Sequence, residues 1–103
     1  MFVFNTTFLV SPDIFAQWQL WMSDTYCPSI GGLMLTNGFE TFEVMTVQED
    51  GSRTFSAQWR CMDAEHLEQI NEMSNDVCGL LPSRFGDKCL CFSSVLKQFS
   101  LLS

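Results

Sequence analysis

The segment from 53 to 61 reads RTFSAQWRC, and apolar and polar residues alternate along it. The odd-numbered positions from Phe55 to Cys61 are apolar, and the even-numbered positions from Thr54 to Arg60 are polar. A repeat of two residues places successive side chains on opposite faces of a β-strand. This segment is therefore predicted to be a strand with one face in the core.

The segments on both sides of this strand predict the elements that join it. Upstream, the turn residues at 49–52 predict a tight hairpin that leads from a second strand over 39–47. Downstream, Asp63 is predicted to cap a helix, because its carboxylate can accept from the free backbone amides of the first turn. Apolar residues recur at helical spacing over 64–81, and Pro82 is expected to break this helix.

The two ends of the chain supply the remaining elements. Residues 2–10 and 88–97 read as strands that carry apolar side chains on both faces. Between them, Ser11-Pro12-Asp13 is predicted to start a helix, with Ser11 as a cap and Pro12 in the first turn. Pro28 and the pair Gly31-Gly32 are expected to end that helix.

The order strand-helix-strand-strand-helix-strand predicts an α+β fold. Two helices on one face of a four-stranded antiparallel sheet form a ferredoxin-like βαββαβ two-layer sandwich. At 103 residues the chain is expected to be a single domain, 1–103. The helices protect only one sheet face, so the apolar residues on the open face are expected to pair with a second copy as a homodimer.

Composition excludes several classes of protein. With 47% hydrophobic and 17% charged residues, the chain is too apolar to be disordered. Ten Phe and three Trp residues favour a dimer or a lined pocket over one small core. A formal charge of −7 repels phosphate backbones and anionic lipid, so neither a nucleic-acid nor a membrane partner is expected. The third strand also lacks the Gly-flanked aromatic pattern of base-stacking modules.

The expected location is the cytoplasm. The amino terminus has no basic region of the signal-peptide kind, and no apolar run reaches the length of a membrane span. Five cysteines cannot all pair with one another. Reduced thiols are therefore expected.

Two motifs resemble one known family. The segment 18–22, WQLWM, with Tyr26-Cys27-Pro28 after three residues, resembles a Trp-x-x-Trp-Met-x-x-x-His-Ile-Pro pattern. The segment 84–88, RFGDK, resembles the carboxyl-terminal signature of the same group, and 4–7, FNTT, resembles its opening strand. The group is a bacterial family known only as a domain of unknown function. The resemblance implies a ferredoxin-like subunit of the dimeric α/β-barrel type. Tyr26 stands where the family has His.

The candidate binding residues are Asn5, Phe55, Trp59 and His66. They are expected to line a small apolar pocket between the sheet and the helices. Few acids, bases or ligands accompany them, which favours a module for ligand binding or protein interaction without catalysis. His66 is the only histidine and has no partner at metal-ligand spacing, so neither a metal nor another cofactor is expected. Asn5 stands among apolar residues, so it either ties down a loop or faces a pocket.

The alternative is an enzyme. Some dimeric α/β-barrel monooxygenases, including haem-degrading ones, carry an Asn on the first strand, a Trp on the third and a His on the second helix. Asn5, Trp59 and His66 resemble that set, and the implied activity is haem-degrading or cofactor-independent oxygenation. His66 falls about one turn too early for an axial haem ligand.

Two further groups have both a functional and a structural interpretation. Cys89 and Cys91 lie on one face of the last strand, where they form a soft-metal pair or act as small core residues. Arg84 and Lys88 bind a small anion or form an ion pair with Asp87 or a neighbouring chain.

Overall fold

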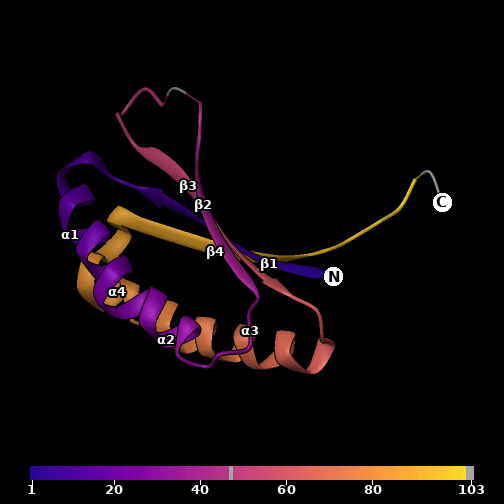
Figure 1. Cartoon of the computed structure of the whole chain (residues 1–103). Helices are drawn as coiled ribbons and strands as arrows, with labels where there is room; N and C mark the ends of the chain where they lie inside the picture. Colours follow the sequence, from indigo (N-terminus) through magenta and orange to yellow (C-terminus); the bar gives the residue numbers. More distant parts are fainter. Residues whose placement is uncertain (47, 102–103) are drawn as a thin grey trace.

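The computed structural model describes residues 1–46 and 48–101, which form one antiparallel sheet with helices on a single face (Figure 1). The spatial order of the strands is β2-β3-β1-β4. Their bounds are β1 Phe2–Val10, β2 Gly38–Val44, β3 Arg53–Cys61 and β4 Cys89–Lys97. The predicted ferredoxin-like α+β fold is confirmed, with β1 and β3 in the centre of the sheet.

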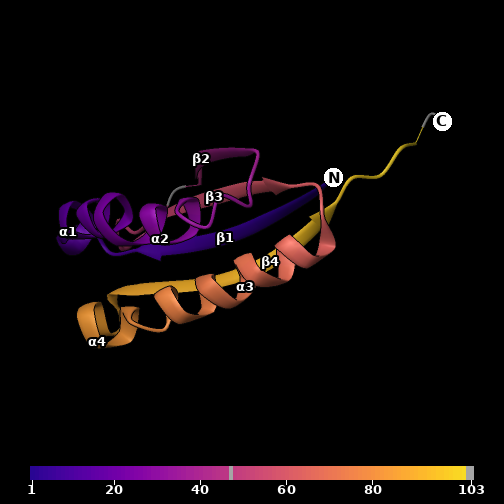
Figure 2. The same ribbon diagram turned by 60° about the horizontal axis from the view of Figure 1, so that its bottom comes forward.

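Helical segments connect β1 to β2 and β3 to β4. The first connection contains the 3₁₀ turn η1 Pro12–Ile14, α1 Phe15–Trp21, the π-helical segment η2 Met22–Tyr26 and α2 Cys27–Gly31. The second contains α3 Ala64–Cys78, α4 Leu81–Phe85 and the 3₁₀ turn η3 Gly86–Lys88. Figure 2 shows α3 running along the sheet below β4, with α1 and α2 beside it. Among the described residues, no helix is long and apolar enough to cross a membrane.

The first helical run differs from the prediction at both ends. Ser11 makes no side-chain capping bond, and its backbone N–H instead donates to the Lys88 carbonyl at 2.9 Å. Pro28 does not end the run, because the π-helical segment precedes it and Pro28 falls in the first turn of α2. The run continues to Gly31.

The π-helical segment decides which side chains reach the sheet. Trp18, Met22, Tyr26 and Ile30 are four residues apart, and all are buried. In a regular α-helix of 3.6 residues per turn, that spacing drifts around the axis. The wider π turn reduces the drift, so all four face the core.

The second helix starts as predicted. The Asp63 carboxylate accepts from the backbone N–H groups of Glu65 at 2.7 Å and His66 at 3.4 Å. Gly86 follows α4 with φ 62°, a left-handed conformation that glycine adopts without strain.

The hairpin between β2 and β3 is longer than predicted. Strand β2 starts at Gly38 and ends at Val44, where the Thr46 N–H donates to the Val44 carbonyl at 2.9 Å and turns the chain out of the sheet. The predicted strand end at 47 lies outside the described residues. Gly51 has φ 80°, as expected for a turn glycine.

The register separates two sheet faces. The inner face packs on the helices, and its core residues include Phe4, Phe8, Val10, Phe55, Ala57, Trp59 and Cys89. The open face consists of four residues from each strand: Val3, Asn5, Thr7, Leu9; Gly38, Glu40, Phe42, Val44; Thr54, Ser56, Gln58, Arg60; Leu90, Phe92, Ser94 and Leu96. The centre of the open face is polar, so the expectation of strands apolar on both faces is correct only for its margins.

Candidate functional site

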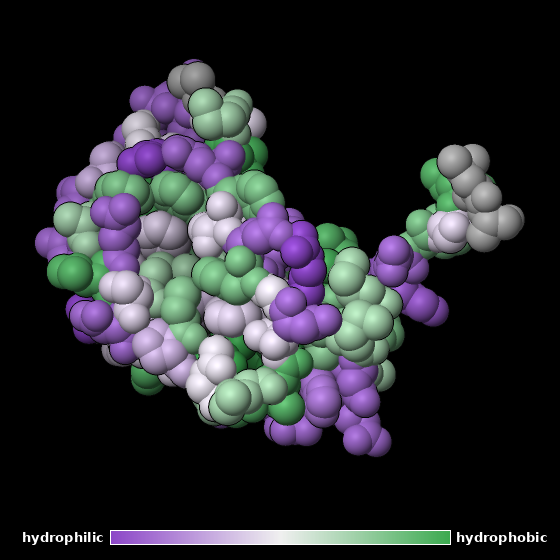
Figure 3. All heavy atoms as spheres, in the orientation of Figure 1, coloured by the Kyte–Doolittle hydropathy of each residue, from purple (hydrophilic) through white to green (hydrophobic). Residues whose placement is uncertain are grey.

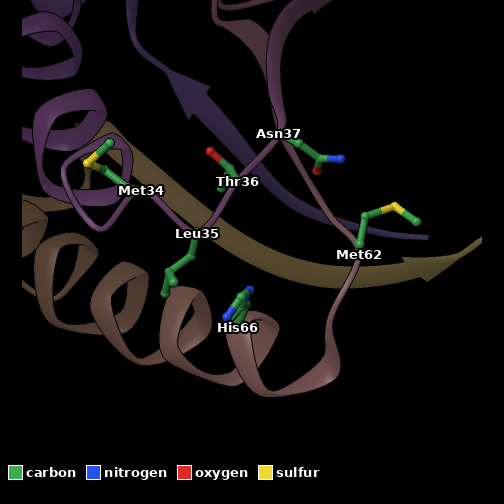
Figure 4. A pocket seen from close by; sticks show the side chains of 6 residues that line it. All are labelled: Met34, Leu35, Thr36, Asn37, Met62 and His66. Atoms are coloured by element: carbon green, nitrogen blue, oxygen red, sulfur yellow. The ribbon is translucent and has the colours of Figure 1, made fainter.

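A hollow of about 260 Å³ opens between the loop after α2 and the start of α3 (Figure 4). It is lined by Met34, Leu35, Thr36, Asn37, Met62 and His66. Four of these come from the loop that leads into β2, Met62 follows β3, and His66 lies in the first turn of α3. The loop is held by the Asn37 N–H, which donates to the Arg60 carbonyl at 3.0 Å.

The hollow is lined by three apolar residues and three polar ones, and His66 is the one with an acid–base side chain. Leu35 and His66 lie on facing sides of it in Figure 4. Met34 and Met62 are 88% and 64% exposed, so two thioether side chains are available at its rim. Within the described ranges, no group of three or more His, Cys, Asp and Glu side chains could hold a metal ion.

Met34 also has an unusual backbone conformation. Its φ is 57°, in the left-handed region that side chains other than glycine rarely adopt. The preceding turn supports this conformation, since the Met34 N–H donates to the Gly31 carbonyl at 3.1 Å. Strain of this kind is frequent at binding sites.

Of the four residues proposed from the sequence, only His66 lines this hollow. Phe55 and Trp59 are buried in the layer between sheet and helices, where Phe55 stacks on Trp18 at 4.7 Å and Trp59 on Phe39 at 4.0 Å. Asn5 lies on the opposite face of the sheet from Trp59. The four residues therefore do not share one pocket.

Asn5 neither ties down a loop nor faces the helices. Its side chain accepts from Ser56 Oγ at 2.5 Å and donates to Thr7 Oγ1 at 3.2 Å. Gln58 extends this network by donating to Ser56 Oγ at 3.3 Å. The amide is satisfied across strands on the open face, an arrangement that depends on the register of β1 against β3.

The arrangement does not fit a haem site of the kind that the resemblance suggested. Asn5 and Trp59 point to opposite sides of the sheet, and His66 opens onto a separate hollow. An axial ligand needs its supporting residues on the same side of the haem pocket. The three side chains cannot act together.

Hydrogen-bonded polar pairs on the inner sheet face replace the expected pocket around Trp59. The indole N–H of Trp59 donates to the Tyr26 hydroxyl at 3.0 Å. On the same inner face, the hydroxyl of the buried Thr6 pairs with Ser93 Oγ at 3.0 Å. Tyr26 stands where the family has His, and its bond to Trp59 was not expected from the sequence. The polar residues at positions 6 and 93, on inner strand faces, were the available signal for the second pair.

Burial raises the pKa of Tyr26 to about 12, against 10.0 ordinarily. Its folded pKa is the higher one, so its contribution to stability is complete below pH 10 and is lost as the pH rises toward 12. A shift of two pKa units corresponds to about 3 kcal/mol. Tyr26 is the only tyrosine, so tyrosinate absorbance reports this group alone.

We expect the tyrosinate absorbance of the native protein to rise with a midpoint near pH 12, accompanied by unfolding. The urea-unfolded protein provides the control, with an expected midpoint near pH 10. A native midpoint equal to that of the unfolded chain would contradict the burial of this hydroxyl.

One buried donor is left without an acceptor among the described residues, the indole N–H of Trp18. Trp18 is only 4% exposed and lies against Phe55. A buried N–H of this kind normally has a partner.

The basic residues near the end of α4 do not form an open anion site. Lys88 forms an ion pair with Asp13, which lowers the pKa of that carboxyl and raises that of the lysine. Arg84 lies over the Phe85 ring at 5.5 Å. Lys88 therefore forms an ion pair, as one of the two interpretations expected, but its partner is Asp13 and not Asp87.

The family model described as "Domain of unknown function (DUF4286)" matches residues 1–99 of the chain. No curated protein matches it.

Several solved structures share the fold at low sequence identity. An "ethyl tert-butyl ether d (ethd) family protein" from Bacillus halodurans has a TM-score of 0.64 at 13% identity, covering 96% of this chain and 100% of that one. A dimeric ferredoxin-like protein from an uncultured marine organism has a TM-score of 0.61 at 12% identity, with 92% of each chain covered. SnoaB, a cofactor-independent oxygenase from Streptomyces nogalater, has a TM-score of 0.53 at 10% identity, covering 98% and 96%. These similarities show the ferredoxin-like fold.

Proposed function

The chain belongs to the DUF4286 family, and we propose that it is a homodimeric module that binds a small apolar ligand without catalysing a reaction. The open sheet face supports the proposed homodimer. The hollow beside His66 supports the proposed binding of a small apolar ligand. A cytoplasmic location completes the proposal and rests on the odd number of cysteines.

The open face is electrically balanced in a strongly acidic chain. Its charged residues are Glu40 and Arg60, and these form an ion pair with each other. The net charge of this face is therefore zero, whereas the whole chain carries −7. Two copies can bring these faces together without the repulsion that other parts of the surface would cause.

The margins of the open face are apolar and half exposed. The edge strands contribute Phe42, Val44, Leu90, Phe92 and Leu96, which are 40% to 66% exposed. Exposed apolar groups gathered on one face are typical of an interaction surface. The central hydroxyl and amide groups of Asn5, Ser56 and Gln58 already bond to one another, so burying them is less costly. A similar structure is described as dimeric, which agrees with this use of the face.

The hollow fits a small apolar molecule with a polar end. Met34, Leu35 and Met62 present flexible apolar side chains, and methionine adapts to ligands of different shape. Thr36, Asn37 and His66 supply the few polar groups that orient a ligand in such sites. Only His66 among the lining residues carries an acid–base side chain, which favours binding over acid–base catalysis.

The enzyme alternative is supported by the similarity of the fold to an oxygenase. Fold similarity at this identity carries no catalytic residues. A cofactor-independent oxygenase needs a base inside a site that excludes water. The hollow is lined by exposed methionines, so it does not exclude water.

Native mass spectrometry of the purified protein, without added ligand, tests both parts of the proposal. We expect a dimer that carries an apolar adduct. In a Met62→Ala variant the adduct should fall several-fold, because a rim contact is removed. Met45→Ala is the matched control, since Met45 is 90% exposed and lies outside the hollow.

Two results would contradict the proposal separately. A monomer at micromolar concentration would exclude the dimer. A dimer whose adduct is equally abundant in Met62→Ala and Met45→Ala would exclude the hollow as the binding site. Turnover of the bound molecule in the presence of oxygen would favour the oxygenase.

A further inference from the structure

The hollow beside His66 has a methionine at each end. Met34 lies in the loop after α2, and Met62 follows β3. Figure 4 shows the two on opposite sides of Leu35 and His66. They are 88% and 64% exposed, so both side chains are open to a ligand. A molecule that binds across the hollow therefore meets a thioether at either end.

The backbone around the hollow is held in place by contacts within the chain. Leu35 packs against the hydrophobic core. His66 lies in the first turn of α3, where its N–H donates to the Asp63 carboxylate at 3.4 Å. The Met34 N–H donates to the Gly31 carbonyl at 3.1 Å. The lining residues thus have fixed positions, and the flexible methionine side chains can adjust to a ligand.

This lining favours an aromatic ring over an aliphatic chain. Methionine sulfur makes favourable contacts with aromatic rings, in addition to the apolar contacts that it makes with any hydrocarbon. The imidazole of His66 is a flat ring on which a second ring can stack. An aliphatic molecule of the same size would gain the apolar contacts alone.

The volume limits the size of the ring system. The hollow measures about 260 Å³. Pockets that hold drug-sized ligands measure about 300–1,000 Å³. A ligand of one or two rings is therefore the size that fits.

The charges beside the hollow disfavour an anionic ligand. Asp63 and Glu65 are exposed acidic residues at the start of α3, next to His66. The Asp63 carboxylate already accepts from the first-turn amides that would otherwise attract an anion. Arg60, whose carbonyl holds the Asn37 N–H, is paired with Glu40. A carboxylate on the ligand would meet negative charge without a free cation beside it.

The remaining lining residues suit a neutral polar group. Thr36 and Asn37 have side chains that can both donate and accept hydrogen bonds. A hydroxyl group on the ligand has the same double capacity. It can bond to these side chains without adding charge to the acidic surroundings.

We propose that the ligand of this hollow is a neutral aromatic compound of one or two rings that carries a hydroxyl group. The inference rests on the proposed function, because it names the class of the small apolar ligand. In this arrangement the ring lies between Met34 and Met62 beside His66. The hydroxyl group faces Thr36 and Asn37.

Three probes with one carbon skeleton test the class of ligand: naphthol, decahydronaphthol and naphthoate, each with its substituent at the same carbon. Naphthol is neutral near pH 7, since phenolic pKa values lie near 10. Calorimetric titration of the full chain should give tenfold or more tighter binding of naphthol than of the other two. Labelling of the six methionine methyl groups with ¹³C locates the site by NMR. Naphthol should shift the Met34 and Met62 signals and leave that of Met45 unchanged.

A Met62→Leu variant isolates the sulfur. Leucine keeps the apolar contact and removes the thioether, so naphthol should bind about two- to tenfold more weakly, while decahydronaphthol should bind as before. Met62 is 64% exposed, so the substitution should leave the fold intact, which circular dichroism checks. Met45→Leu is the matched control and should bind naphthol as the parent does.

The outcomes separate this inference from the proposed function. Equal binding of decahydronaphthol and naphthol would overturn the aromatic class, and equal binding of naphthoate would overturn the neutral one. If no probe binds while the purified protein carries an apolar adduct that depends on Met62, the class alone is wrong. If no probe binds and no such adduct is found, the proposed ligand binding fails as well.

Discussion

A Phe92→Asp variant is expected to be monomeric at concentrations where the parent protein is dimeric. Phe92 is 66% exposed at the margin of the open face, which otherwise has no net charge. In the proposed face-to-face dimer, each copy would bury one added carboxylate. An unpaired buried charge costs several kcal/mol, enough to lower the association constant by a factor of about a thousand or more.

Sedimentation or light scattering after size exclusion measures this change. Leu20→Asp is the control, because Leu20 is 59% exposed on α1, away from the open face. It adds the same charge and should leave the dimer intact. A Phe92→Asp variant that is as dimeric as Leu20→Asp would move the interface away from the open face.

A Phe8→Ala variant is expected to lose about 3–5 kcal/mol of unfolding free energy. Phe8 is fully buried, and its ring contacts Trp18 at 5.5 Å, Trp21 at 6.2 Å and Tyr26 at 5.5 Å. It therefore joins the first helical run to the centre of the sheet. The total free energy of unfolding of such domains is about 5–15 kcal/mol, so this variant would lose a large part of it.

Urea denaturation gives the measurement, as a lower transition midpoint with a similar slope. Phe99→Ala removes the same atoms from a residue that is 80% exposed after β4, so its effect should stay within about 0.5 kcal/mol. Figure 3 shows hydrophobic groups on this segment, which leaves the body of the molecule towards the C-terminus. Equal losses in the two variants would contradict the assigned core.

The strands and the second helix were predictable because local chemistry decides them. The alternation from 53 to 61 requires a strand whatever its partners are, and β3 has these bounds. Asp63 caps α3 through bonds to residues two and three positions away, so its role is visible in the sequence. Ser11 has the same residue preference, but its backbone N–H bonds to distant Lys88, and the cap is not made.

The candidate site was only partly predictable. His66 lines the hollow, but the loop residues from Met34 to Asn37 and Met62 were not identified. They carry no pattern of their own, and they meet His66 because the loop after α2 crosses the start of α3. The alternation of β1 could separate Asn5 from Phe4 and Phe8, but only the pairing with β3 shows that Asn5 bonds to Ser56.

The sequence by itself determined the order of the elements and the two faces of each strand, since periodicity and caps act over a few residues. The tertiary structure alone decided the pairs that join distant segments, namely Tyr26 with Trp59 and Phe8 with Trp18. These contacts depend on how the helices pack across the sheet, and on the π-helical segment that turns Tyr26 inward. Packing is a property of the whole chain, so no local pattern records it.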